Sequence, residues 1–344
     1  MKKLFLLVPV AALAMTACTS ESTESVGAAQ QPKEIAFTAL AQPGTRAAAD
    51  TYQYAIDGTD FPHDLNMYVA AYQVSPTATN YFAGTQFVYN NAGGASASSG
   101  YWGGATAKYW PLAPAYINFL AYANVTGTAA FDGTTPASQA VITQTDNSSA
   151  QTDLMYAIGN GAVTQSDNTL TFPAKVDMQF KHAQAWMDFY VKAYSTVETA
   201  ITINSITLTG AKYSGTYTIT HTNYGANAGQ SVAGVWSSTG SQGNYAVPGW
   251  SATALTTSLV QVGHGLMIVP DDDAATADWT SFTINYTYDG KTYDYTYAPT
   301  TDAGRSVVQA NHYIFNITFK LHEIFVNATV ADWTDNTTAI TVAE

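Results

Sequence analysis

The feature that most constrains the fold is the alternation of apolar and polar residues in many short segments bounded by turn residues. The clearest case is residues 282–288, which Asp289 and Gly290 connect to a second alternating run at 292–297. An Asp-Gly pair between two such runs is a strong signal for a β-hairpin. No segment after residue 51 has the period of a long amphipathic helix. The sequence therefore predicts an all-β protein built of antiparallel β-sandwiches.

Two other runs, residues 116–123 and 266–269, are apolar except at Asn118 and do not alternate. We expect both to be strands that are covered on both faces. Residues 178–191 predict one long or bulged strand. Residues 126–149 are rich in glycine, threonine, alanine and glutamine, which predicts a long surface loop.

The composition bounds the number of domains and the class of partner. Of the 344 residues, 47% are hydrophobic, and the length suggests two domains once a leader is removed. Pro173 follows a strand-like segment and resets the chain, so we expect the domains to be residues 47–172 and 173–344. The net charge of −13 disfavours nucleic acid and anionic membrane surfaces as partners.

The first 17 residues have the pattern of a secretory signal peptide. Two lysines precede an uncharged apolar run at residues 4–15, which is too short to cross a bilayer as a helix. Small residues then lead to Cys18, the only cysteine, as in a bacterial lipobox, although Met15 stands where leucine is usual. We expect a lipid on Cys18, the alternative being an ordinary signal peptide with an incidental cysteine. Residues 19–31 have little to bury and are expected to form a solvated tether.

A single strand is predicted just after this tether. Residues 33–40 alternate, with Ile35 and Phe37 on one face, and Pro43-Gly44 ends the run. Arg46 follows in a small-residue linker, where a protease can reach it. Two interpretations remain open at this point. Residues 18–46 are either a tether with a removable first strand, or they end in a strand that stays permanently paired.

The chain also ends in strand-forming sequence. Ile324, Val326, Ala328 and Val330 alternate on one face, and the alternation resumes in residues 340–342 after an interruption at 335–336. Such a strand either packs within its own domain, which is the commoner case, or pairs with the open edge of a neighbouring molecule.

No pattern of catalytic, cofactor-binding or metal-binding residues is found. None of the six histidines has the spacing of a metal site, and His182, in a strand-like segment, is expected to be a hydrogen-bonded structural residue. Residues 271–273 with Asp278 could bind calcium, although a solvated acidic loop is the preferred interpretation. Four aromatic residues could stack on sugars or simply pin loops, namely Tyr101, Trp102, Trp236 and Trp250.

Short segments along nearly the whole chain resemble the fimbrillin family of Bacteroidetes surface pili. They are the leader that ends at Cys18 and residues 35–37, 45–47, 109–111, 117–122, 153–157, 180–183, 266–270 and 326–333. Each segment is weak alone, and it is their order and spacing that carry the resemblance. The chain departs from the family at residues 271–273, where three aspartates stand in a place at which relatives often have glutamine.

The resemblance implies a tandem pair of transthyretin-like β-sandwiches, export as a lipoprotein, and cleavage between Arg46 and Ala47. Loss of the first strand, with Ile35 and Phe37, would open a groove that the C-terminal strands of another subunit fill. The donor residues implied are Ile324, Val326, Val330, Trp333, Ile340 and Val342.

The expected function is therefore that of a non-enzymatic structural subunit of a bacterial cell-surface fimbria, without a cofactor. Its expected partners are copies of itself, related pilus subunits and, before cleavage, outer-membrane lipid through Cys18. The long C-terminal strand region resembles a stalk subunit, although the family also includes tip and anchor subunits. The alternative from another class is a monomeric lipid-anchored adhesin for a glycan or a host protein.

Overall fold

A computed structural model describes most of the chain as strands and the turns between them. The described residues are 30–41, 61, 65–90, 100–125, 127–132, 138–144, 152–221, 234–237, 240–249, 251–271, 277–300, 305–320, 323–332 and 335–342. They contain no α-helix and one 3₁₀ turn, Glu198–Ala200, so the prediction of an all-β protein is confirmed. All elements described below lie in one unit of the chain, Pro32–Glu344.

The first sheet closes on itself as a ring of seven strands. Its order is β10-β1-β4-β3-β2-β5-β8-β9, and a further pairing of β10 with β8 joins the ends so that only β9 lies outside the ring. The strands are β1 (Ala36–Ala41), β2 (Met67–Ser75), β3 (Thr79–Asn90), β4 (Tyr101–Gly104), β5 (Ala115–Ala123), β8 (Met155–Ser166), β9 (Thr169–Thr171) and β10 (Val176–His182). A closed ring leaves few unpaired edges.

Side chains fill the interior of this ring. Phe37, Phe87, Phe119 and Phe180 are buried there together with Trp110. A Cβ atom added to Gly161 of β8 would lie 2.4 Å from the Trp110 ring, so this position has no room for a side chain. The ring is therefore a packed core and not a channel.

Strand β5 has buried side chains on both faces, which confirms the prediction from its largely apolar sequence. Ile117 and Phe119 point into the ring, while Leu120 and Tyr122 belong to a separate cluster with Tyr217 and other residues. That cluster includes residues of a four-stranded sheet in the order β14-β13-β7-β6. The strands are β6 (Thr128–Asp132), β7 (Ser138–Gln144), β13 (Gly215–His221) and β14 (Val235–Trp236).

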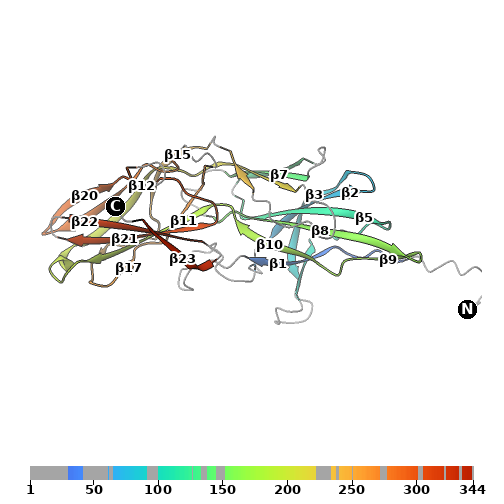
Figure 1. Cartoon of the computed structure of the whole chain (residues 1–344), viewed down its shortest axis with the longest axis horizontal. Helices are drawn as coiled ribbons and strands as arrows, with labels where there is room; N and C mark the ends of the chain where they lie inside the picture. Colours follow the sequence, from blue (N-terminus) through green and yellow to red (C-terminus); the bar gives the residue numbers. More distant parts are fainter. Residues whose placement is uncertain are drawn as a thin grey trace, which may run out of the picture. The chain divides into compact units, whose positions relative to one another are not determined.

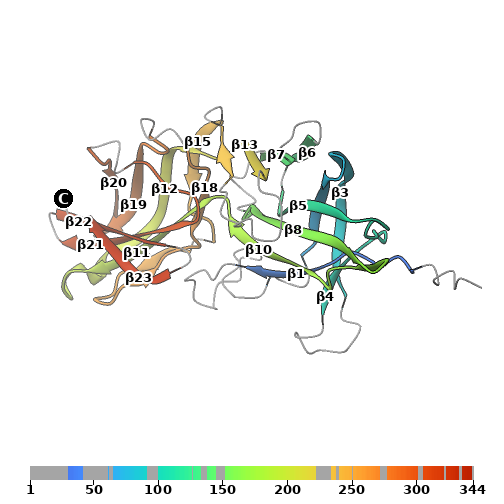
Figure 2. The same ribbon diagram turned by 45° about the vertical axis from the view of Figure 1, so that its right-hand side comes forward.

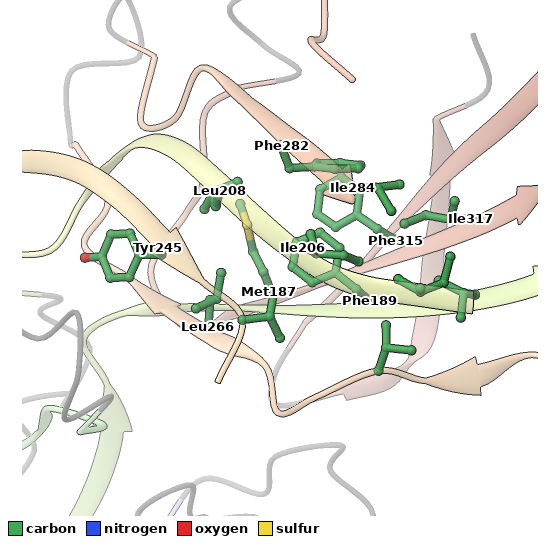
Figure 3. Packing of buried hydrophobic residues seen from close by; sticks show 14 of the residues in the cluster. Met187, Phe189, Ile206, Leu208, Tyr245, Leu266, Phe282, Ile284, Phe315 and Ile317 are labelled. Atoms are coloured by element: carbon green, nitrogen blue, oxygen red, sulfur yellow. The ribbon is translucent and has the colours of Figure 1, made fainter. Parts of the chain in front are cut away.

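The second large core lies between two further sheets (Figure 3). One has the order β17-β11-β21-β22-β23, with β18 also paired to β11, and the other has the order β15-β12-β19-β20, with β16 paired to β12. Their strands are β11 (Ala185–Ala193), β12 (Thr202–Lys212), β15 (Gln242–Ala246), β16 (Thr253–Ala254), β17 (Val260–Gln261), β18 (Leu266–Ile268), β19 (Ser281–Tyr288), β20 (Lys291–Tyr297), β21 (Asn311–Lys320), β22 (Glu323–Asp332) and β23 (Asp335–Val342). Phe189, Phe282 and Phe315 meet at the centre of this core, with ring centroids 5.3–5.4 Å apart.

The predicted hairpin is confirmed. Strands β19 and β20 pair from Phe282 and Tyr297 down to Tyr288 and Lys291. The two turn residues have positive φ angles, 48° for Asp289 and 69° for Gly290. Both central residues of a type I′ turn need this conformation, which explains why Asp-Gly was a reliable signal.

Three expectations about strands are wrong. Residues 128–132 and 138–144 are paired strands and not parts of a surface loop, because β7 is held between β6 and β13. Residues 178–191 form two strands in different sheets, β10 and β11, instead of one bulged strand. The sheets are also not wholly antiparallel, since β1 pairs with β10 and β11 pairs with β21 in parallel.

The expected boundary between domains precedes β10 in the chain. Val176, Met178 and Phe180 of β10 are buried in the core of the ring, and the next strand, β11, contributes to the second core. The chain therefore changes from one core to the other at residues 183–184.

Candidate strand-exchange site

Strand β1 occupies a slot whose two sides come from distant parts of the chain. On one side it runs parallel to β10, with pairs from Phe37 and Val176 to Ala41 and Phe180. On the other side Ala36 and Phe37 pair with Gly103 and Trp102 of β4. Figure 1 shows β1 in blue next to β10 in green. The slot would have two unpaired edges if β1 were absent.

The residues just before β1 extend this pairing. The Ile35 amide donates to the Lys108 carbonyl over 2.7 Å, and the Trp110 amide donates to the Lys33 carbonyl over 2.9 Å. Thr38 also donates a side-chain hydrogen bond to the Asp177 carboxylate of β10. Residues 33–41 are thus paired at successive positions along their length.

The buried face of β1 holds it in the ring. Ile35 and Phe37 are fully buried, whereas Leu40 on the opposite face is 45% exposed. The Phe37 ring meets Phe87 and Phe119 edge-on, with centroids 4.9 and 5.1 Å apart and interplanar angles of 84° and 83°. Edge-to-face pairs of this kind add to the stabilisation from burial.

The C-terminal strands lie at the edge of the other sheet. β22 pairs antiparallel with β21 over the whole of both strands, and Ile324, Val326 and Ala328 pack against the second core. Among the described strands β23 pairs with β22 alone, and its register includes Val330 with Ile340 and Ala328 with Val342. Figure 2 shows β22 and β23 in red beside each other. In the free chain β22 contributes to its own core, while β23 is an edge strand.

Several predicted site residues lie outside the described residues. These are Cys18, Arg46, Ala47 and Trp333, together with Trp250 among the aromatic candidates. Ile340 and Val342 are described only as parts of the backbone of β23. The structure therefore brings Ile35 and Phe37 together in the slot of β1, and it places Ile324, Val326 and Val330 on β22.

The residues that form the slot were not predicted from the sequence. Trp102, Gly103 and Lys108 pair with the first strand from one side and residues 176–180 from the other. No spacing in the sequence links segments this far apart. The unbroken alternation of residues 176–180 was the only signal that this strand has a buried face.

The other candidate sites are structural. His182 is fully buried and its Nδ1 lies 2.7 Å from the Asp153 carboxylate, which confirms a hydrogen-bonded structural residue. Trp102 and Trp236 are buried, so of the two alternatives sugar stacking does not apply to them, and Tyr101 is half-buried. Asp271 is also buried, where its carboxylate contacts the Lys212 ammonium, so it does not belong to a solvated acidic loop.

The described residues form neither a metal site nor a membrane-spanning helix. They contain no group of three or more histidine, cysteine, aspartate or glutamate side chains that could hold a metal ion. In the same part of the chain, no helix has the length and hydropathy needed to cross a membrane.

A model of the fimbrillin-like family matches residues 28–333 of the chain. The match begins just before β1 and extends through β22. None of the curated protein sequences is significantly similar to the chain.

Several solved structures are similar to the chain at low sequence identity. A protein from Bacteroides ovatus with a suggested role in cell adhesion matches with a TM-score of 0.52 and 13% identity, over 88% of this chain and 99% of that one. A protein from Bacteroides uniformis with the same suggested role matches with a TM-score of 0.49 and 17% identity, over 88% and 99% of the two chains. The tip fimbrial protein Mfa3 from Porphyromonas gingivalis, truncated at its C-terminus, matches with a TM-score of 0.43 and 14% identity, over 88% and 100%.

Proposed function

The chain belongs to the fimbrillin-like family, whose members are non-enzymatic fimbrial and cell-adhesion proteins at the bacterial cell surface, and we propose that it is a fimbrial subunit. We propose further that it assembles by strand exchange. In this proposal residues 1–17 are a signal peptide, Cys18 carries a lipid at the outer membrane, and a protease cuts after Arg46. Residues 33–46 then leave the ring, and the C-terminal strands of another copy or of a related subunit enter the vacated slot. The proposal includes the tandem transthyretin-like domains that the family resemblance implies, with one of the two large cores in each.

The observation that carries the proposal is the position of β1. It is the first described strand of the chain, and it lies between β4 and β10, which follow much later in sequence. Cleavage on its C-terminal side would release it without interrupting the rest of the ring. The empty slot would expose unpaired backbone groups on both sides and the apolar pockets that Ile35 and Phe37 had filled. Such a site is a template for another strand.

The apolar residues that the slot would lose with β1 and gain with β23 have the same spacing. Ile35 and Phe37 are two positions apart, and so are Ile340 and Val342 in β23. Burial of two large apolar side chains contributes about 3–6 kcal/mol in either case. The exchange is therefore nearly balanced in hydrophobic burial, and removal of the first strand by proteolysis gives it a direction.

Within the tail, the pairing supports β23 as the strand that moves first. β23 has one neighbour among the strands that the structure describes, whereas β22 is paired with β21 along ten positions and contributes side chains to its own core. Withdrawal of β22 would leave a cavity where Ile324 and Val326 were packed. Donation of β23 avoids this cost.

The proposal is tested with the purified full-length chain and an arginine-specific protease. The sequence has two arginines, Arg46 and Arg305, so each can be replaced separately. We expect cleavage of the wild-type chain to give a product that starts at Ala47 and forms a ladder of oligomers. Arg46→Gln should abolish both, whereas the control Arg305→Gln should retain both. A chain cut at Ala47 that stays monomeric would contradict the proposal and favour a monomeric adhesin.

A further inference from the structure

Three buried charged residues meet at the edge of the second core. Lys212 ends β12, Asp271 follows β18, and Asp278 precedes β19. The side chains of Lys212 and Asp271 are 3% and 2% exposed, and Asp278 is fully buried. Charged groups are rarely buried to this extent without a specific arrangement around them.

Backbone hydrogen bonds fix the three residues against one another. The Lys212 amide donates to the Asp278 carbonyl over 3.3 Å, and the Lys212 carbonyl accepts from the Val269 amide over 3.2 Å. The Asp278 carboxylate accepts from the Asp271 amide over 2.5 Å and from the Val307 amide over 2.6 Å. The Lys212 Nζ and the Asp271 Oδ2 are thereby held in contact.

The surroundings disfavour charge on this group of residues. Burial raises the pKa of Asp278 to about 6, although its hydrogen bonds and the Lys212 charge act in the opposite direction. Asp278 therefore keeps its proton up to about pH 6, above the range of an ordinary aspartate. A buried ion pair loses the hydration of both ions, whereas an amide in the same place has no charge to hydrate.

From this arrangement we propose that Lys212 and Asp271 become joined by an amide bond between their side chains, with Asp278 as the acid that transfers protons. Transfer of one proton from the Lys212 ammonium to the Asp271 carboxylate gives a neutral amine and a neutral acid. The Nζ lone pair then attacks Cγ of Asp271, so that a C–N bond forms and the C–OH bond breaks. The Asp278 carboxyl protonates the departing hydroxyl and accepts a proton from nitrogen, so that one water leaves and Asp278 is restored. No other reactant is needed.

The bond would connect the two sheets of the second core. β12 belongs to one sheet, and Asp271 follows β18, which pairs with β11 in the other. The contact holds the reacting groups together before reaction, which is the condition under which intramolecular steps become fast. Such a bond would keep the sheets joined when the chain is denatured or pulled, whatever role the protein has at the cell surface.

Mass spectrometry of the denatured and proteolysed full-length chain tests the proposal. We expect a branched peptide containing Lys212 and Asp271 that is lighter by one water than the sum of its two linear peptides. Lys212→Arg and Asp271→Ala should each abolish it. Recovery of only linear peptides from the wild-type chain, or persistence of the lost water in Lys212→Arg, overturns the proposal.

Two further variants separate loss of the bond from loss of the fold. Asp271→Asn should still react, now with release of ammonia, and should give a branched peptide of the same mass as the wild type. The control Asp188→Asn weakens a buried contact elsewhere, between Asp188 of β11 and His312 of β21, and should leave the branched peptide intact. Failure of Asp271→Asn to form the branched peptide while its circular dichroism matches that of the wild type overturns the proposed chemistry.

Discussion

Replacement of Phe37 by alanine tests directly whether β1 is a structural part of the ring. Phe37 is fully buried and lies edge-on between Phe87 and Phe119. Truncation of a buried phenylalanine costs about 3–5 kcal/mol, because the transfer free energy is lost and a cavity remains. Leu40 lies on the opposite face of the same strand and is 45% exposed, so Leu40→Ala should change stability by less than about 0.5 kcal/mol.

Hydrogen exchange read out by mass spectrometry localises this effect. Peptides from β4 and β10 flank the slot, and their amides should lose protection when β1 is weakened. A loss of about 4 kcal/mol corresponds to a roughly thousandfold faster exchange. We expect this acceleration in Phe37→Ala and not in Leu40→Ala, with peptides from β19 unchanged in both variants.

The same variant separates the two states of the protein. In the uncut chain Phe37→Ala should have its full effect, whereas in assembled fibres that have lost residues 33–46 the substituted residue is absent and the effect should disappear. Equal exchange at β10 in Phe37→Ala and Leu40→Ala would refute the account of β1 as a buried strand. If Phe37→Ala still accelerates hydrogen exchange at β10 in fibres, the proposed removal of β1 is refuted.

Two further predictions concern the tail and the buried carboxyl. Deletion of residues 335–344 should leave the free energy of unfolding within about 1 kcal/mol, because it removes an edge strand, and yet abolish oligomer ladders after cleavage. Deletion of residues 323–344 should in addition lower the unfolding free energy by about 3 kcal/mol, because Ile324 and Val326 leave the core. Urea titration measures the unfolding free energy, and gel electrophoresis shows whether oligomer ladders form. The raised pKa of Asp278 means that the folded state binds its proton more tightly than the unfolded state. This contribution to stability is present below about pH 4 and is lost as the pH rises through about 6. Over this window the free energy of unfolding of the wild-type chain should fall by about 3 kcal/mol relative to that of Asp278→Asn. Urea titrations at successive pH values measure the difference.

The class of fold and the individual strands were predictable from local signals. Alternation identified β1 and β19, and Asp289-Gly290 fixed the hairpin because both residues readily adopt positive φ. The apolar run of β5 correctly indicated a strand covered on both faces. These features depend on periods of two residues and on turn chemistry, both of which are visible in a short window.

The closure of the ring was not predictable, because it depends on contacts between distant segments. The parallel pairing of β1 with β10 joins residues about 140 positions apart, and nothing in either segment specifies the other. The loop expected at 126–149 contains β7, a strand held between two others, whose short apolar centre at residues 140–142 lies among polar residues that concealed it. Asp271 was misjudged for a related reason, since only the fold brings Lys212 next to it.

The most direct test of strand exchange is the N-terminal sequence of the protein in fibres sheared from the cell surface. We predict a single start at Ala47, with residues 33–46 absent from the fibres. A fibre whose subunits start at Cys18, or retain residues 33–46 in any form, would contradict the removal of β1 and with it the proposed assembly.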